Sequence, residues 1–97
     1  MVTRIVKMTF RTDTAETFLS IFEQYKSRIR HTQGCTHLSL LRDVNQPTVF
    51  FTYSHWEAEE YLEAYRLSAT FGDVWPQVKP LFGAPAEAWT VSEEIVP

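Results

Sequence analysis

The chain has 97 residues, which is enough for one domain spanning residues 1–97 and too few for two. Its 9 basic and 12 acidic residues give a net charge of −3, which argues against a general nucleic-acid or anionic-membrane binder. Hydrophobic residues make up 44% and charged residues 22%, as in ordinary globular domains, whereas the aromatic content of 14% is high. We therefore expect a small globular domain with an aromatic pocket or interface in addition to its core.

The single cysteine, Cys35, cannot form an internal disulfide, which indicates a reducing compartment. The first ten residues lack the continuous hydrophobic block of a signal peptide, and no apolar run approaches the length of a membrane span. The sequence therefore predicts a cytoplasmic protein with neither membrane nor nucleic acid among its partners.

The chain begins with a predicted strand over residues 2–10, in which polar and apolar residues alternate. One face of this strand is apolar except for Arg4. Asp13 precedes Glu16 by three residues, a spacing typical of a helix start that Asp13 caps. The helix that follows has an apolar stripe, which ends in a basic last turn and at Gly34. The stripe consists of Phe18, Ile21, Phe22, Tyr25 and Ile29.

Two further strands are predicted at about Cys35–Arg42 and at Val49–Trp56, and the short turn between them favours an antiparallel hairpin. The strand Val49–Trp56 is bulky on both faces, so it must be covered on both sides. The faces consist of Val49, Phe51, Tyr53 and His55, and of Phe50, Thr52, Ser54 and Trp56.

The remainder of the chain predicts a second helix, a short helical segment and a last strand. Acidic residues from Glu57 favour the helix N-terminus, and its stripe consists of Ala58, Tyr61, Leu62, Tyr65 and Ala69. Pro76 and Pro80 then interrupt an apolar stretch, so with Asp73 as N-cap we expect only one or two helical turns. A last strand is expected from about residue 87 to residue 96, with Trp89, Val91 and Ile95 on one face.

The element order β-α-β-β-α-(short α)-β fits an α+β domain of the ferredoxin-like type, with one antiparallel sheet and helices on one face. Because the helices cover one face of the sheet only, we expect a homodimer in which two sheets pack face to face.

The chain resembles the antibiotic biosynthesis monooxygenase family of dimeric α/β barrels. The matching features are the pair Gly34-Cys35, the strands 38–43 and 51–57, and the segments 62–65 and 68–71. The resemblance covers nearly the whole chain and is more specific for the fold than for the chemistry. It implies a dimeric ferredoxin-like barrel. It also implies activities such as cofactor-independent oxygenation of quinols and polycyclic phenols, haem degradation, or isomerisation of a small phosphorylated sugar-like signal.

This sequence departs from the family at two positions. Many enzymes of the family carry histidines where Tyr65 and Thr70 stand. Trp75 falls near the position of the histidine that the haem-degrading members use, so no axial iron ligand is evident there. We therefore expect no haem and no other cofactor.

Cofactor-independent oxygenation needs an electron-rich aromatic substrate, an apolar aromatic pocket, and a base or hydrogen-bonding group that favours the substrate anion. Trp75 could stack on a substrate ring or pack in the core, and the Tyr65 hydroxyl could orient a substrate oxygen or bind a backbone carbonyl. We choose His37, among leucines in the second predicted strand, as the candidate base ahead of His55 and the helix-terminal His31. The candidate catalytic residues are therefore His37, Tyr65 and Trp75.

The candidate substrate-binding residues are Tyr25, Tyr53 and Phe71, and Tyr53 could face either the pocket or a dimer interface. No metal site is expected, although His37 and His55 could approach each other across the hairpin. Cys35 is expected to be a buried, unreactive thiol because no activating neighbour is evident.

The first functional hypothesis is a cofactor-independent monooxygenase acting on a quinol or other small aromatic molecule, which would be its small-molecule partner. The alternatives are a non-catalytic dimeric protein that binds a hydrophobic small molecule, and an isomerase of a small oxygenated metabolite that would use His37 with Tyr65.

Overall fold

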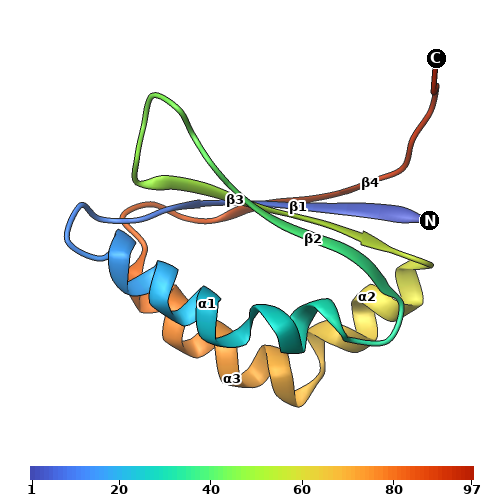
Figure 1. Cartoon of the computed structure of the whole chain (residues 1–97), viewed down its shortest axis with the longest axis horizontal. Helices are drawn as coiled ribbons and strands as arrows, with labels where there is room; N and C mark the ends of the chain where they lie inside the picture. Colours follow the sequence, from blue (N-terminus) through green and yellow to red (C-terminus); the bar gives the residue numbers. More distant parts are fainter.

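The computed structural model describes all 97 residues. They form one antiparallel sheet, and every helix lies on the same face of that sheet (Figure 1). The elements are β1 (Val2–Thr9), α1 (Ala15–Arg30), β2 (Cys35–Arg42), β3 (Val49–Trp56), α2 (Glu59–Arg66), α3 (Ala69–Val78), the 3-10 turn η1 (Lys79–Leu81) and β4 (Glu87–Val91). The strand order is β2-β3-β1-β4. This arrangement confirms the predicted α+β, ferredoxin-like fold, and the bounds of β2 and β3 agree with the predicted strands.

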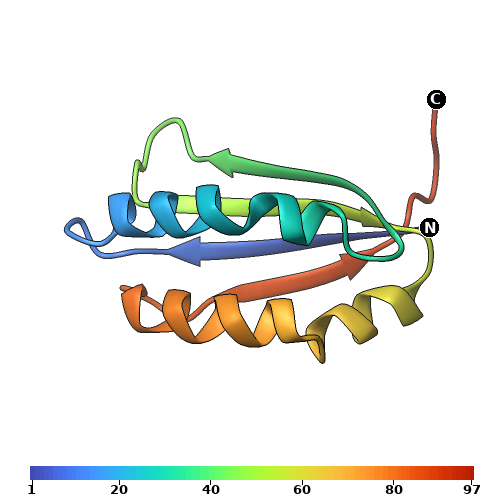
Figure 2. The same ribbon diagram turned by 60° about the horizontal axis from the view of Figure 1, so that its bottom comes forward.

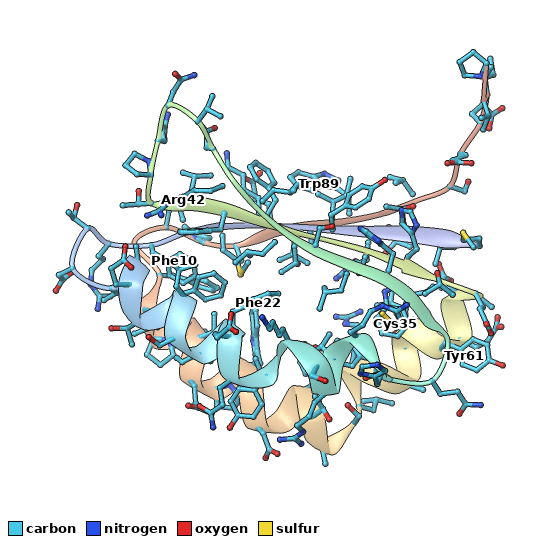
Figure 3. The ribbon with its side chains drawn as sticks, in the orientation of Figure 1. Phe10, Phe22, Cys35, Arg42, Tyr61 and Trp89 are labelled. Atoms are coloured by element: carbon cyan, nitrogen blue, oxygen red, sulfur yellow. The ribbon has the colours of Figure 1, made fainter.

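The register of the sheet decides which side chains face the helices. Arg4 of β1 lies opposite Ser54 of β3, and Leu38 of β2 lies opposite the same serine. Successive strand residues point to opposite faces, so the neighbours of these residues lie on the face that no helix covers. In Figure 3, Phe10 and Phe22 lie between sheet and helices, whereas Trp89 of β4 lies on the other side.

The core consists of two clusters at opposite ends of the layer between sheet and helices. The larger is built on Phe10, Phe18 and Phe50, and the rings of Phe10 and Phe18 stack at 4.3 Å between centroids. The smaller is built on Cys35, Trp56 and Leu62. The sheet and helices are therefore held together at both ends, and the space between the two clusters is free to form a pocket.

Helix α1 does not begin as predicted. Its N-cap is Thr14 and not Asp13, and no side chain caps the helix. The Thr14 hydroxyl donates instead to the carbonyls of Leu81, at 2.7 Å, and of Arg11, at 3.2 Å. The Thr14 hydroxyl is thus directed at η1, a non-local contact that the local spacing of Asp13 and Glu16 does not reveal.

Helix α3 is longer than predicted, with ten residues from Ala69 to Val78. Its N-cap is Ser68, whose hydroxyl accepts the backbone N–H of Phe71 at 3.3 Å, and not Asp73. Pro76 lies in the last turn, where its missing N–H removes a hydrogen bond without ending the helix at once. Strand β4, in contrast, ends at Val91, so Ile95 lies beyond it and is 84% exposed.

The helices form a single layer in which α1 runs beside α3, and α2 precedes α3 on the same side of the sheet (Figure 2). Arg28 of α1 donates to Asp73 of α3 at 2.9 Å, which joins the two helices on their outer side. No helix has the length and apolar character that crossing a membrane requires.

Candidate functional site

A cavity of about 400 Å³ lies between the sheet and the helices, which is within the size range of small-molecule sites. All four strands and all three α-helices contribute to its wall, and 15 of its 19 lining residues are hydrophobic. The hydrophobic ones are Val6, Met8, Phe18, Phe22, Ile29, Leu38, Trp56, Leu62, Tyr65, Phe71, Val74, Trp75, Val78, Ala86 and Ala88. The other four are Arg4, Thr52, Ser54 and Arg66.

One wall of the cavity is a continuous row of aromatic rings. Tyr65 at the end of α2 lies 5.2 Å from Trp56 of β3 and 5.5 Å from Phe71, between ring centroids. Phe71 and Trp75 lie one turn apart on α3 and stack at 5.7 Å with their planes 13° apart. A flat apolar ring of a ligand could lie against this row, because offset stacking is favourable between such faces.

Tyr65 presents its hydroxyl as a hydrogen-bond donor. Burial of the hydroxyl is the main cause that raises the pKa of Tyr65 to about 12, and the nearby Cys35 is the second. No hydrogen bond to another residue opposes this shift. The hydroxyl is therefore protonated at neutral pH and free to donate to an oxygen of a bound molecule.

The other polar groups of the cavity are two arginines and two hydroxyls. Ser54 already accepts the indole N–H of Trp56 at 2.9 Å. Arg4 donates to the Thr90 hydroxyl at 2.8 Å, and Arg66 lies 3.3 Å from the Glu63 carboxylate. No Asp, Glu, His or Cys lines the cavity, so its wall provides hydrogen-bond donors and no ordinary general base.

Three of the candidate residues from the sequence meet in the cavity. Tyr65, Phe71 and Trp75 all line it and touch one another in the aromatic row. Tyr25 does not line it, because its hydroxyl accepts the side-chain amide of Gln77 at 3.1 Å and its ring lies under Arg28. Tyr25 thereby joins α1 to α3.

His37 and Tyr53 lie on the face of the sheet that the helices leave uncovered. His37 is opposite His55, and the rings of His37, Tyr53 and His55 lie 5.0–6.0 Å from one another between centroids. His37 also lies 2.6 Å from the Ser39 hydroxyl. The structure therefore does not bring His37 together with Tyr65, and Tyr53 faces away from the cavity.

The position of His37 follows from a β-bulge in β2. The register with β3 shifts between Cys35 and His37, so Thr36 is an extra residue. Without the bulge these two residues would share one face; with it, Cys35 turns into the core while His37 turns outward. Burial raises the pKa of the Cys35 thiol, which disfavours the reactive thiolate.

Sequence reasoning missed the two arginines as site residues. Arg4 had a visible signal, because it is the one charged residue among the inward-facing apolar residues of β1. Arg66 had none, since a basic residue in the last turn of a helix is usually explained by the helix dipole. No group of three or more His, Cys, Asp and Glu side chains is arranged to hold a metal ion.

Comparison with known proteins gives the same fold many times. A conserved protein from Methanosarcina mazei Go1 superimposes with a TM-score of 0.90 at 15% identity, over 97% of this chain and 94% of that one. A Nitrosomonas europaea protein assigned to the antibiotic biosynthesis monooxygenases has a TM-score of 0.90 at 18% identity, over 98% and 100%. The crystal structure of an antibiotic biosynthesis monooxygenase has a TM-score of 0.89 at 15% identity and full coverage of both chains (100%).

The fold and the cavity together define a ferredoxin-like α+β protein with an aromatic-walled cavity between its sheet and its helices. The family model for antibiotic biosynthesis monooxygenases matches residues 1–75, and the chain belongs to that family. No curated protein matches it.

Proposed function

We propose that this protein is a cofactor-independent monooxygenase that oxidises a quinol or other small aromatic molecule in the cavity between sheet and helices. The observation that carries the proposal is the aromatic row from Tyr65 to Trp75, which borders an apolar cavity large enough for one small aromatic molecule. Family membership supports the reaction type.

The reaction needs no external reductant. A phenol with a free ring C–H reacts with O2, one oxygen atom forms the new ring carbonyl, and the other leaves as water with the ring hydrogen and the hydroxyl hydrogen. The ring loses four electrons and O2 gains four. In this proposal the aromatic row holds the ring, the neutral Tyr65 hydroxyl donates to a substrate oxygen, and the apolar wall excludes water.

Oxygen uptake with a panel of hydroquinones and naphthalenediols tests this function. We expect turnover by the native protein, and at least a tenfold lower kcat/KM in Tyr65→Phe and Trp75→Phe, since positioning groups contribute roughly this much or more. Tyr61→Phe is the matched control, because Tyr61 packs near Gly34 and does not line the cavity. Native rates in both cavity variants would disprove the site, and a loss confined to His37→Gln would move it to the uncovered face.

A non-catalytic binding function is the second candidate, and the absence of an ordinary base from the cavity wall favours it. It predicts a ligand that binds tightly and is recovered unchanged, with no oxygen consumed. The isomerase alternative loses support, because its acid-base pair of His37 and Tyr65 would have to act from opposite faces of the sheet.

We also propose that a second copy of the chain covers the uncovered sheet face. This face carries partly exposed aromatic and aliphatic side chains, with Leu41 49% exposed and Trp89 and Val91 each 44% exposed. The β2–β3 connection and the C-terminal segment both project to this side of the sheet (Figure 1). A sheet with one apolar face open is stabilised by packing on its own equivalent in a two-fold dimer.

A further inference from the structure

Arg4 is an unusual residue for its place in the fold. It lies on the helix-facing side of β1 with Val6 and Met8, and it lines the cavity with them. Its one hydrogen bond within the chain goes to the neutral Thr90 hydroxyl at 2.8 Å, and no carboxylate lies within salt-bridge distance of it. The guanidinium is partly desolvated and has only a neutral partner, so it can still bind an anionic group through charge-assisted hydrogen bonds.

A second arginine adds to the positive charge in the cavity. Arg66 at the end of α2 also lines the cavity. The pKa of Arg4 is lowered, first by burial of its guanidinium and second by the nearby charge of Arg66. Glu63 is the acidic group that opposes this effect, and it lies beside Arg66 outside the lining. Two cations with one carboxylate leave a net positive charge at the cavity of a chain whose overall charge is −3.

We propose that the ligand of this cavity is a flat aromatic molecule with an anionic oxygen group, a carboxylate or an ionised hydroxyl, which Arg4 and Arg66 bind. The inference rests on the proposed function for the location of the ligand and adds the charge of the ligand to it. The ring lies against Tyr65, Phe71 and Trp75, and the anionic group lies toward the guanidinium groups, which suit carboxylate and phenolate oxygens.

The two arginines also account for a cavity without an ordinary base. A nearby cation stabilises the ionised form of a hydroxyl and lowers its pKa. A phenolic substrate could therefore bind as its anion, with its proton released to solvent, and no side chain would have to remove that proton in the cavity. The electron-rich anion is the form that transfers an electron to oxygen in the proposed reaction.

Calorimetric binding of 2-naphthoate and of its neutral isostere 2-naphthamide to the native protein tests the inference. We expect naphthoate to bind at least about tenfold more tightly than naphthamide, because a charge-assisted hydrogen bond contributes about this much to the affinity. Arg4→Met should remove most of this preference, because it weakens naphthoate binding far more than naphthamide binding. A native circular dichroism spectrum would show that the variant is folded. Arg66→Met should reduce the preference, whereas Lys26→Met removes the same charge from the outer side of α1 and should have no effect.

A second experiment distinguishes a carboxylate from an ionised hydroxyl as the anionic group of the ligand. Bound 2-naphthol at pH 8 should show more of the naphtholate absorbance band than free 2-naphthol, and Arg4→Met should abolish the difference. An effect with naphthoate alone assigns the carboxylate, and an effect with naphthol alone assigns the ionised hydroxyl; either supports the inference.

Equal binding of naphthoate and naphthamide, with no ionisation of naphthol, would overturn the anion site and leave the proposed aromatic cavity intact. Binding of none of the three probes would overturn the inference and count against the proposed cavity function as well. A preference for naphthoate that persists in both arginine variants would place its origin elsewhere and equally refute the assignment.

Discussion

Gly34 and Gly72 show how differently single glycines contribute to this fold. Gly34 has a φ of +85°, and a Cβ there would collide with the ring of Tyr61. Gly72 is inside α3, and a Cβ there would meet nothing within 4 Å. Only at Gly34 do the conformation of the chain before β2 and the packing of α2 both require the absence of a side chain.

We predict that Gly34→Ala lowers the free energy of unfolding by about 2 kcal/mol or more, because left-handed strain and steric overlap add. Gly72→Ala should raise it by about 0.5–1 kcal/mol, since alanine is the better helix residue and has room there. Urea denaturation followed by circular dichroism measures both. A Gly34→Ala protein as stable as the native one would show that α2 can move away at no cost.

Tyr65 makes a further prediction at the residue scale, through its raised pKa. Because burial raises the pKa of Tyr65 from 10 to about 12, the unfolded chain loses this proton first, and stability falls as the pH rises from about 10 to about 12. The loss should amount to about 3 kcal/mol, since the shift spans about two pKa units and one unit corresponds to about 1.4 kcal/mol.

Denaturation at a series of pH values, compared between native protein and variants, measures this effect. Tyr65→Phe should remove the part of the decline that Tyr65 causes, whereas Tyr61→Phe should keep it. Parallel pH profiles for the native protein and Tyr65→Phe would contradict the burial of the Tyr65 hydroxyl.

At the scale of elements, the start of α3 positions the aromatic row. Ser68 ends the connection from α2, and its hydroxyl accepts the Phe71 N–H at 3.3 Å and donates to the Tyr65 carbonyl at 2.6 Å. This one hydroxyl therefore joins the backbones of two residues of the row. Ser68 caps α3, and this helix carries Trp75 one turn beyond Phe71.

We predict that Ser68→Ala lowers the free energy of unfolding by about 1 kcal/mol, as expected for loss of an N-cap, and weakens binding of aromatic probes in the cavity. Ser20→Ala is the matched control, because Ser20 is exposed inside α1 and its hydroxyl returns to the Glu16 carbonyl of the same helix. Thermal denaturation and probe titration measure the two effects. An equal, small effect of both substitutions would show that α3 does not depend on its cap.

At the scale of the whole molecule, the sheet is covered on one face by its helices and open on the other (Figure 1). The open face carries the ring cluster of His37, Tyr53 and His55 beside Phe51 and Trp89. A small domain with this much apolar surface on one side is stabilised by a partner that excludes water from it.

We predict a mass of twice the chain mass by sedimentation at micromolar concentration, and a shift to the monomer in Trp89→Lys, which puts a charge in place of an apolar ring on the open face. Leu67→Lys should stay dimeric, because Leu67 is 89% exposed and lies between α2 and α3 on the helix side. A native mass of one chain would refute the dimer.

Much of the fold was predictable because its signals are local. Alternation and turn residues placed β2 and β3, and the element order defined the fold class. The candidate site was predictable only in part. Tyr65, Phe71 and Trp75 were found from apolar stripes on helices, whereas His37 and Tyr53 were assigned without knowledge of their face.

The sequence by itself determined the elements, their order and the aromatic residues available to line a cavity. Backbone preference and the periodicity of side chains along an element act between near neighbours in the chain. The tertiary structure alone decided that a bulge at Thr36 turns His37 outward and that Arg4 and Arg66 line one cavity. Register and packing decide these features because they depend on contacts between segments far apart in the chain.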